Sequence, residues 1–344
     1  LTVMVEDAGD GEVKFRRAVS FVDCPGHESL MANMLSGAAV MDGALLVIAA
    51  NEPCPRPQTK EHLTALEVLG VDKIVVVQNK VDLVDKEEAV KNYEQIRAFL
   101  ETSKVAKDVP IIPVSSIFKL NLDYLLEAIE RYIPTPNRDL SKPPRMFVIR
   151  SFDVNKPGVS YEDLQGGVLG GSLLQGKLKV GDEIEILPGY LERKGDKIVH
   201  EPLYAEITSL STRFLKLKEA KPGGLIGVQT DLDPSLTRAD RMIGNIIGAP
   251  GTLPDVVYEV GMAVHLFEYV VGTEETVRVP PIQRGEPLRI NVGSATTLAA
   301  VTGVRGDSIE VRVMKPVVVD KGWKAALARR VDGRWRLIGV GVIE

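Results

Sequence analysis

The sequence predicts an α/β domain with a mostly parallel sheet, followed by two all-β domains of the β-barrel type. Strand and helix patterns alternate up to about residue 132, proline-rich segments follow, and short β-rich runs between Gly, Pro and Asp clusters fill the rest. The 344 residues suffice for two or three domains of about 150 residues each. We expect domains at 1–140, 145–253 and 254–344.

The α/β domain is expected to open with a hairpin whose second arm runs from Val13 to Asp23. Apolar residues then recur at helical spacing between Leu30 and Ala38. The further expected strands span 45–48, 74–77 and 111–114, and the further expected helices span 59–69, 86–100 and 122–132. This alternation favours a parallel sheet covered by helices.

The all-β part is predicted from proline and from strand-like runs. Helical periodicity stops at Pro134, Pro136, Pro143 and Pro144, as expected of a connector. The runs 177–180, 183–187 and 225–228 are typical of small barrels. A second proline-containing break at 250–254 leaves about 90 residues for another domain of the same kind.

Composition excludes several classes of protein. With 44% hydrophobic and 26% charged residues, the chain has a globular composition, and it has no apolar run of the ~20 residues that a membrane span requires. Cys24 and Cys54 are too few for a disulfide framework, so we expect a reducing, cytoplasmic setting. The net charge of -5 argues against a generally basic nucleic-acid coat. We expect no membrane and no DNA partner.

The first candidate site is Asp23-Cys24-Pro25-Gly26-His27, where an expected strand gives way to an expected helix. Anions bind at such junctions because exposed backbone N–H groups and the helix dipole face them. Gly26 allows close approach of a phosphate, Asp23 can hold Mg²⁺ through water, and His27 can orient an attacking water as the catalytic residue. The alternative is a turn with an N-capping acid.

The second candidate site is Asn79-Lys80-Val81-Asp82, directly after an expected strand. Nucleotides lie beyond the carboxyl ends of strands in such sheets. Asp82 can accept two hydrogen bonds from guanine that adenine cannot offer, Lys80 can lie over the purine, and Asn79 can tie neighbouring loops together. A polar surface loop is the alternative for these residues taken alone.

Ser115 and Ser116 follow the next expected strand. One candidate phosphate-binding segment and two candidate base-binding segments therefore occur in this order along the chain, each at the end of a successive expected strand. This order predicts a P-loop-type GTPase domain that binds GTP or GDP with Mg²⁺. The phosphate loop G-x-x-x-x-G-K-[S/T] is not found before the hairpin, so we expect the first strand, phosphate loop and switch 1 to precede Leu1.

The motifs at 23–27 and 79–82 resemble those of the translational GTPases related to elongation factor Tu. The segments 50–62, 150–158 and 334–339 resemble, more narrowly, the gamma subunit of the archaeal and eukaryotic translation initiation factor 2. Members usually have Ser-Ala-x where this chain has Ser115-Ser116-Ile117.

The resemblance implies a GTPase that binds methionylated initiator tRNA, delivers it to the small ribosomal subunit, assembles with alpha and beta subunits and uses hydrolysis as a release switch. The alternatives are a factor that delivers an elongator or selenocysteine tRNA, and a scaffold that joins partner subunits.

A basic strip lies near the C-terminus. Between 321 and 336 it holds six basic residues and one acid. Arg329, Arg330, Arg334 and Arg336 are its candidate tRNA contacts, because phosphate contacts require only positive charge. An alternative with equal support is that these arginines form the solvated face of a strand pair.

Overall fold

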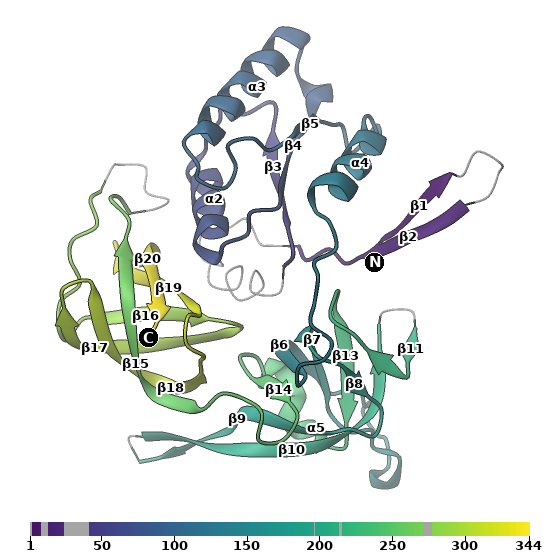
Figure 1. Cartoon of the computed structure of the whole chain (residues 1–344), viewed down its shortest axis with the longest axis vertical. Helices are drawn as coiled ribbons and strands as arrows, with labels where there is room; N and C mark the ends of the chain where they lie inside the picture. The colour runs from purple at the N-terminus through teal and green to yellow at the C-terminus, as the bar shows by residue number, and fades with distance from the viewer. Residues whose placement is uncertain (1, 8–12, 24–40, 196, 213–214, 271–276) are drawn as a thin grey trace.

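The computed structural model describes residues 2–7, 13–23, 41–195, 197–212, 215–270 and 277–344 (Figure 1). It shows an α/β domain and two barrels in chain order, as the sequence predicts. Within these ranges, no helix combines the length and apolar character needed to cross a membrane.

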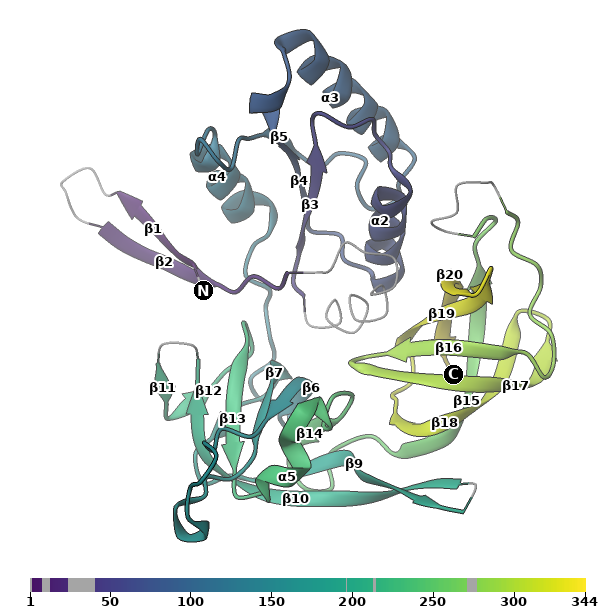
Figure 2. The same cartoon turned by 180° about the vertical axis from the view of Figure 1, so that it is seen from behind.

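The α/β domain, called the G domain below, contains a three-stranded parallel sheet of order β3-β4-β5. Helices α2 and α3 lie on one side of this sheet and α4 on the other (Figures 1 and 2). An antiparallel hairpin of β1 and β2 projects from the domain. The elements are β1 (Thr2–Asp7), β2 (Val13–Val19), β3 (Ala44–Ala49), α2 (Pro57–Leu69), β4 (Ile74–Asn79), α3 (Lys86–Glu101), β5 (Ile111–Pro113) and α4 (Leu122–Tyr132).

Local sequence sets the helix ends. Helix α2 begins at Pro57, whose missing N–H costs nothing there, and ends at Gly70, which takes the left-handed conformation at φ 74°. Helix α3 begins after Asp85, whose carboxylate accepts the Glu88 N–H at 2.9 Å. Strand β4 is buried on both faces, which explains its continuous apolar run.

The second domain is a closed ring of six strands in the order β10-β13-β7-β6-β14-β9, with β9 pairing back to β10. Its core is aliphatic. The ring strands are β6 (Arg145–Phe152), β7 (Val168–Gln175), β9 (Glu183–Lys194), β10 (Lys197–Ser211), β13 (Ile226–Thr230) and β14 (Ile246–Gly248). Outside the ring lie β8 (Leu178–Lys179), β11 (Lys216–Leu217), β12 (Glu219–Ala220) and the short helix α5 (Pro234–Thr237).

The third domain is a closed barrel of order β15-β18-β17-β16-β19-β20. All of its strand pairs are antiparallel. Its strands are β15 (Val256–Leu266), β16 (Pro287–Val292), β17 (Ala295–Arg305), β18 (Ser308–Val318), β19 (Lys324–Val331) and β20 (Arg334–Ile343).

The two barrels meet in an apolar contact that includes an ion pair, and the Tyr258 hydroxyl of the third domain accepts the His200 N–H of the second at 3.2 Å. Trp323 of the third domain meets the Phe147 ring of the second edge-on, with centroids 5.4 Å apart. Arg145 lies against the same indole and pairs with Asp320 at 3.0 Å. This contact connects the barrels through side chains as well as through the chain.

The G domain rests on the third domain through α2, which packs against β19 and β20. Glu61 of α2 and Arg336 of β20 form an ion pair at 2.9 Å with side chains only 6% and 10% exposed. A Cβ built on Gly70 would lie 2.9 Å from Lys324 Nζ, so an ammonium group lies at the C-terminal end of α2, where the helix dipole favours it.

Candidate functional site

Asn79 lies at the carboxyl end of β4 and holds the following loop in shape. Its side-chain oxygen accepts the Lys80 N–H at 2.8 Å, and Lys80 takes the left-handed conformation at φ 64°. Asp82 follows in a short 3-10 turn, Val81–Leu83. Lys80 and Asp82 are both exposed, and Asp82 has no hydrogen-bond or ion-pair partner among the residues that the structure describes.

The same asparagine binds the loop after β5. Asn79 Oδ1 accepts the Ser116 N–H at 3.2 Å, and Asn79 Nδ2 donates to Ser116 Oγ at 3.4 Å. The two backbones are also joined, since Val81 N–H donates to the Val114 carbonyl at 3.3 Å. Residues 37 apart in sequence therefore form one surface at the sheet edge.

Ser115 has a different place from Ser116. It is fully buried, and its hydroxyl accepts the Phe118 N–H at 3.3 Å. Its backbone exchanges two hydrogen bonds with Leu120. Ser115 therefore shapes the loop from inside, while Ile117 and Phe118 are 75% and 73% exposed beside it.

The predicted phosphate segment is described only at its start. Asp23 is exposed and lies four residues after the end of β2. It lines a cavity with Gly43 and Ala44 where β3 begins, whereas Asn79 lies at the carboxyl end of β4. The structure therefore places Asp23 and the Asn79 loop toward opposite ends of the sheet, and not at the successive strand ends that the sequence predicts. Gly26 and His27 lie outside the described residues, as do Cys24 and the expected helix between Leu30 and Ala38.

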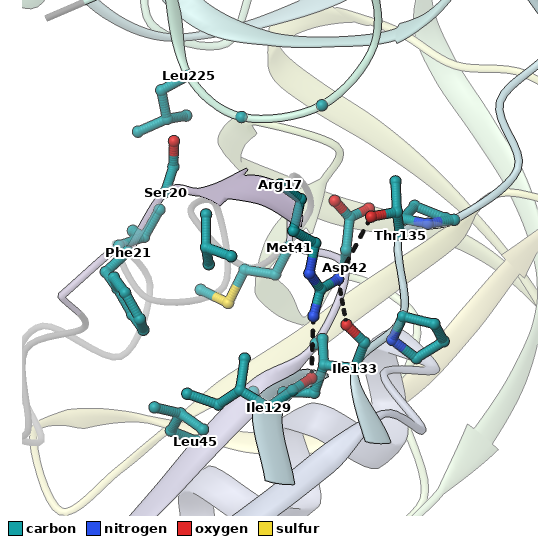
Figure 3. Close-up of a pocket in the computed structure, with 18 of the residues that line it drawn as sticks. Arg17, Ser20, Phe21, Met41, Asp42, Leu45, Ile129, Ile133, Thr135 and Leu225 are labelled. Carbon is teal, nitrogen blue, oxygen red and sulfur yellow. Dashed lines mark hydrogen bonds between the residues drawn. The ribbon is translucent and has the colours of Figure 1, made fainter. Parts of the chain in front are cut away.

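A cavity of about 820 Å³ lies beside this segment, between the G domain and the second domain (Figure 3). It is lined by 17–23, by 41–47, by the end of α4 and by the loop 222–225. Arg17 fixes one wall by donating to the carbonyls of Ile133 at 2.7 Å and Ile129 at 3.0 Å. These carbonyls end α4, where a cation is favourable.

Burial shifts the pKa of two titratable groups of the G domain, one at this cavity and one outside it. Burial lowers the pKa of His62, which lines the cavity from α2, below its ordinary 6.5. Burial raises the pKa of the Cys54 thiol to about 11. In the parts of the chain that are described, no three His, Cys, Asp or Glu side chains group as a metal site.

The four candidate arginines near the C-terminus are not equivalent. Arg336 is buried against Glu61 of the G domain. Arg329 is bound by both carboxylate oxygens of Glu286 and donates to the Pro280 carbonyl at 2.7 Å. Arg330 and Arg334 are exposed, with Arg330 Nε donating to the Gly333 carbonyl at 3.2 Å.

Sequence reasoning missed three features of this molecule. They are the Arg17 contact with α4, the Glu61–Arg336 pair and a group of lysines on the second domain. The lysines could have been found from the sequence, because Lys177 and Lys179 flank an apolar residue at the spacing that places both on the same face of a strand. The other two join residues more than 110 positions apart, and spacing gives no sign of them.

Comparisons with known proteins agree with this architecture. Residues 10–135 match the elongation factor Tu GTP binding domain, and 166–248 match elongation factor Tu domain 2. Residues 258–343 match the C-terminal model of initiation factor eIF2 gamma. The translation initiation factor 2 subunit gamma of Pyrococcus abyssi is 55% identical over 97% of this chain and 81% of its own length. This chain belongs to the gamma-subunit family.

Other members of the family have a similar level of sequence identity to this chain. The gamma subunit of Methanocaldococcus jannaschii is 54% identical with the same coverage, and that of Archaeoglobus fulgidus is 55% identical over 78% of its own length. As a member of this family, the chain is a guanine-nucleotide-binding translation initiation factor and a GTPase.

Solved structures support the fold alone. The elongation factor SelB from Methanococcus maripaludis in its apo form has a TM-score of 0.73 at 22% identity, covering 94% of this chain and 69% of that one. A bacterial selenocysteine-specific elongation factor has a TM-score of 0.73 at 23% identity, covering 92% of this chain and 47% of that one.

Proposed function

We propose that Asn79, Lys80, Asp82, Ser115 and Ser116 form the guanine site of this GTPase. The observation that carries the proposal is the bonding of Asn79 to Lys80 and Ser116, which sets two loops side by side. The Asp82 carboxylate is exposed to receive the base, and the Lys80 stem can cover one purine face. Ser115 acts from inside the loop.

We further propose that the phosphates meet the segment that starts at Asp23. Asp23 offers an exposed carboxylate, an oxygen ligand that suits Mg²⁺ held through water. The magnesium ion would neutralise charge on the phosphates. Gly26 would donate its N–H to the terminal phosphate, and His27 would orient the attacking water as the catalytic residue.

The cargo we propose is methionylated initiator tRNA, carried to the small ribosomal subunit in the cytoplasm, with hydrolysis releasing it. The relatives are called gamma subunits, which supports assembly with alpha and beta subunits. We propose domain limits at 1–140, 145–253 and 254–344. Delivery of an elongator or selenocysteine tRNA has less support, because the match over 258–343 is to the initiation factor.

The experiment is a four-state binding cycle with the full-length protein and its partner subunits. Initiator tRNA should bind about tenfold more tightly with GTP than with GDP, a coupling of about 1.4 kcal/mol. Since coupling is reciprocal, the tRNA should raise GTP affinity by the same factor.

Elongator tRNA is the control for this cycle and should bind more weakly with either nucleotide. Equal affinity of initiator tRNA for the GTP, GDP and nucleotide-free states would contradict the switch and favour a scaffold that joins partner subunits.

A further inference from the structure

Three lysines converge on one carboxylate on the second domain. Lys177 and Lys179 lie 3.9 Å from the Glu219 carboxylate, and Lys221 lies 3.6 Å from it, measured from Nζ to the nearer oxygen. We call these three lysines with Glu219 the lysine cluster. Strands β8 and β12 bring them together, because Lys179 and Glu219 are direct partners in that antiparallel pair.

Strand geometry places the lysine cluster outside the barrel. Leu178 and Ala220 alternate with the cluster residues, and each is only 1% exposed. Side chains on either side of them therefore point to solvent. The three lysine side chains are 39%, 62% and 58% exposed.

The cluster carries more positive charge than its carboxylate balances. Its ion-pair distances of 3.6–3.9 Å exceed the roughly 2.7–2.9 Å of a charge-assisted hydrogen bond, so Glu219 holds no lysine tightly. Lys216 and Lys218 are also exposed on the adjoining chain, whereas Asp182 accepts the backbone N–H of Lys179 at 2.7 Å. The surface stays basic on a chain of net charge -5.

We propose that the lysine cluster binds the phosphodiester backbone of an RNA. Phosphate contacts require positive charge and no apolar anchor, whereas protein interfaces are depleted in lysine and centre on buried apolar or aromatic side chains. Leu178 and Ala220, which are interleaved with this cluster, are buried in the barrel core, and the exposed apolar residues next to it, Val180 and Leu215, are of types that are rare among the residues that anchor protein interfaces. The proposal rests on the proposed function, which supplies two RNA sources, initiator tRNA and the small ribosomal subunit.

This assignment places RNA on a different barrel from the basic strip of 321–336. In that strip, Arg329 and Arg336 are each bound to a carboxylate. In the lysine cluster, three lysines share the single carboxylate of Glu219. Lys221 is followed by the loop 222–225, where a Cβ on Gly224 would lie 3.0 Å from Ser20 Oγ of the G domain. RNA on the cluster therefore lies beside the junction of these two domains.

The test uses full-length protein with its partner subunits and GTP, in one arm with initiator tRNA and in the other with small ribosomal subunits. The triple variant Lys177→Gln, Lys179→Gln, Lys221→Gln should lose about tenfold in affinity in the arm that uses the cluster. Its slope of log affinity against log salt should fall by about 2–3, since each phosphate contact contributes about 0.7–0.9.

Two further variants make the result specific. Lys86→Gln, Lys91→Gln, Lys107→Gln removes the same charge from exposed positions of the G domain and should leave affinity and slope unchanged. Glu219→Gln should act in the opposite direction, raising RNA affinity by about threefold, because the lysines lose their one central carboxylate.

Unchanged affinity and slope in both arms for the cluster variant, with tight binding by the wild type, would overturn the proposal and leave the proposed function standing. Loss of a partner subunit instead of RNA would overturn it in favour of an acidic protein surface. Failure of the wild type to bind either RNA would overturn both.

Discussion

Asn79 joins two loops with one side chain, and this makes it the organising residue of the proposed guanine site. Its oxygen accepts two backbone N–H groups, from Lys80 and Ser116, which a carboxylate or a shorter side chain could not match while Nδ2 also donates to Ser116 Oγ. The Ser116 hydroxyl makes that last contact possible.

Replacing Asp82 by Asn should weaken GTP binding by about 1.5–3 kcal/mol, because a charged acceptor of guanine N–H groups becomes in part a donor. Affinity for xanthine nucleotides should rise, since xanthine offers a carbonyl where guanine has an amine. Nucleotide dissociation constants of the full-length protein measure both. Asp108→Asn, at an exposed site on the same domain, is the control. GTP affinity unchanged in Asp82→Asn would remove Asp82 from the site.

The sequence indicates where a residue lies along a strand or loop better than it indicates which distant residue it contacts. Asn79, Asp82 and Ser116 could be proposed as site residues from the sequence because each follows a strand of the parallel sheet, and the structure brings Asn79 and Ser116 into contact. Arg336 could be noticed only as a positive charge. Its partner Glu61 lies 275 positions away on another domain, and only the folded chain brings them together.

At the scale of elements, helix α3 supports the base loop through a buried polar side chain. Asn92 accepts from Gln78 Nε2 at 2.9 Å and donates to the Glu52 carbonyl at 2.7 Å. Gln78 directly precedes Asn79 in β4. The helix thereby fixes the end of β4 that carries the site.

Asn92→Ala should destabilise the protein by about 1–3 kcal/mol, because the Glu52 carbonyl and Gln78 lose a partner away from water. It should also weaken nucleotide binding. Asp85→Ala is the matched control: it removes the α3 N-cap, costs about 1 kcal/mol, and leaves Asn92 in place. Thermal unfolding and nucleotide titration separate the effects. Equal loss of nucleotide affinity in both variants would assign it to general destabilisation.

The helices and sheet strands of the G domain were predictable because their apolar spacing is regular. Helix α4 occupies the expected 122–132, and α3 differs from 86–100 by one residue. Strand β10 was not predicted: it runs for 15 residues, and its first half is poorly buried, so it lacks the apolar run that marks a strand. Its pairing with β9 stabilises that half instead.

At the scale of the whole molecule, the Glu61–Arg336 pair sets how the G domain rests on the third domain. Glu61→Gln removes the carboxylate charge that pairs with the buried Arg336 guanidinium and should cost about 3–5 kcal/mol of stability. Arg336→Met should cost a similar amount. Together the two changes should cost much less than their sum, since well-packed neutral side chains can replace a buried pair.

Chemical unfolding of the four proteins measures this cycle, and hydrogen exchange in α2 and β20 shows whether the loss is at this interface. Strictly additive costs would mean that Glu61 and Arg336 are not coupled. Arg312→Met, which breaks an exposed pair with Glu259, is the control and should cost under about 1 kcal/mol.

The polypeptide passes from the G domain to the barrels once, through 133–145, and the contact of α2 with β19 and β20 is a second, non-covalent attachment. Together they make a closed circuit. While the connector 133–145 is intact, it keeps α2 close to β19 and β20, at an effective concentration in the millimolar range expected of short linkers. A protease that cut this connector would abolish that effective concentration but would leave the contact of α2 with β19 and β20 in place. The fragments would then separate only on dilution below the dissociation constant of the whole interface, which includes the α2 contact and the contact of Ser20 with the loop 222–225, so a nicked molecule reports the combined strength of these contacts.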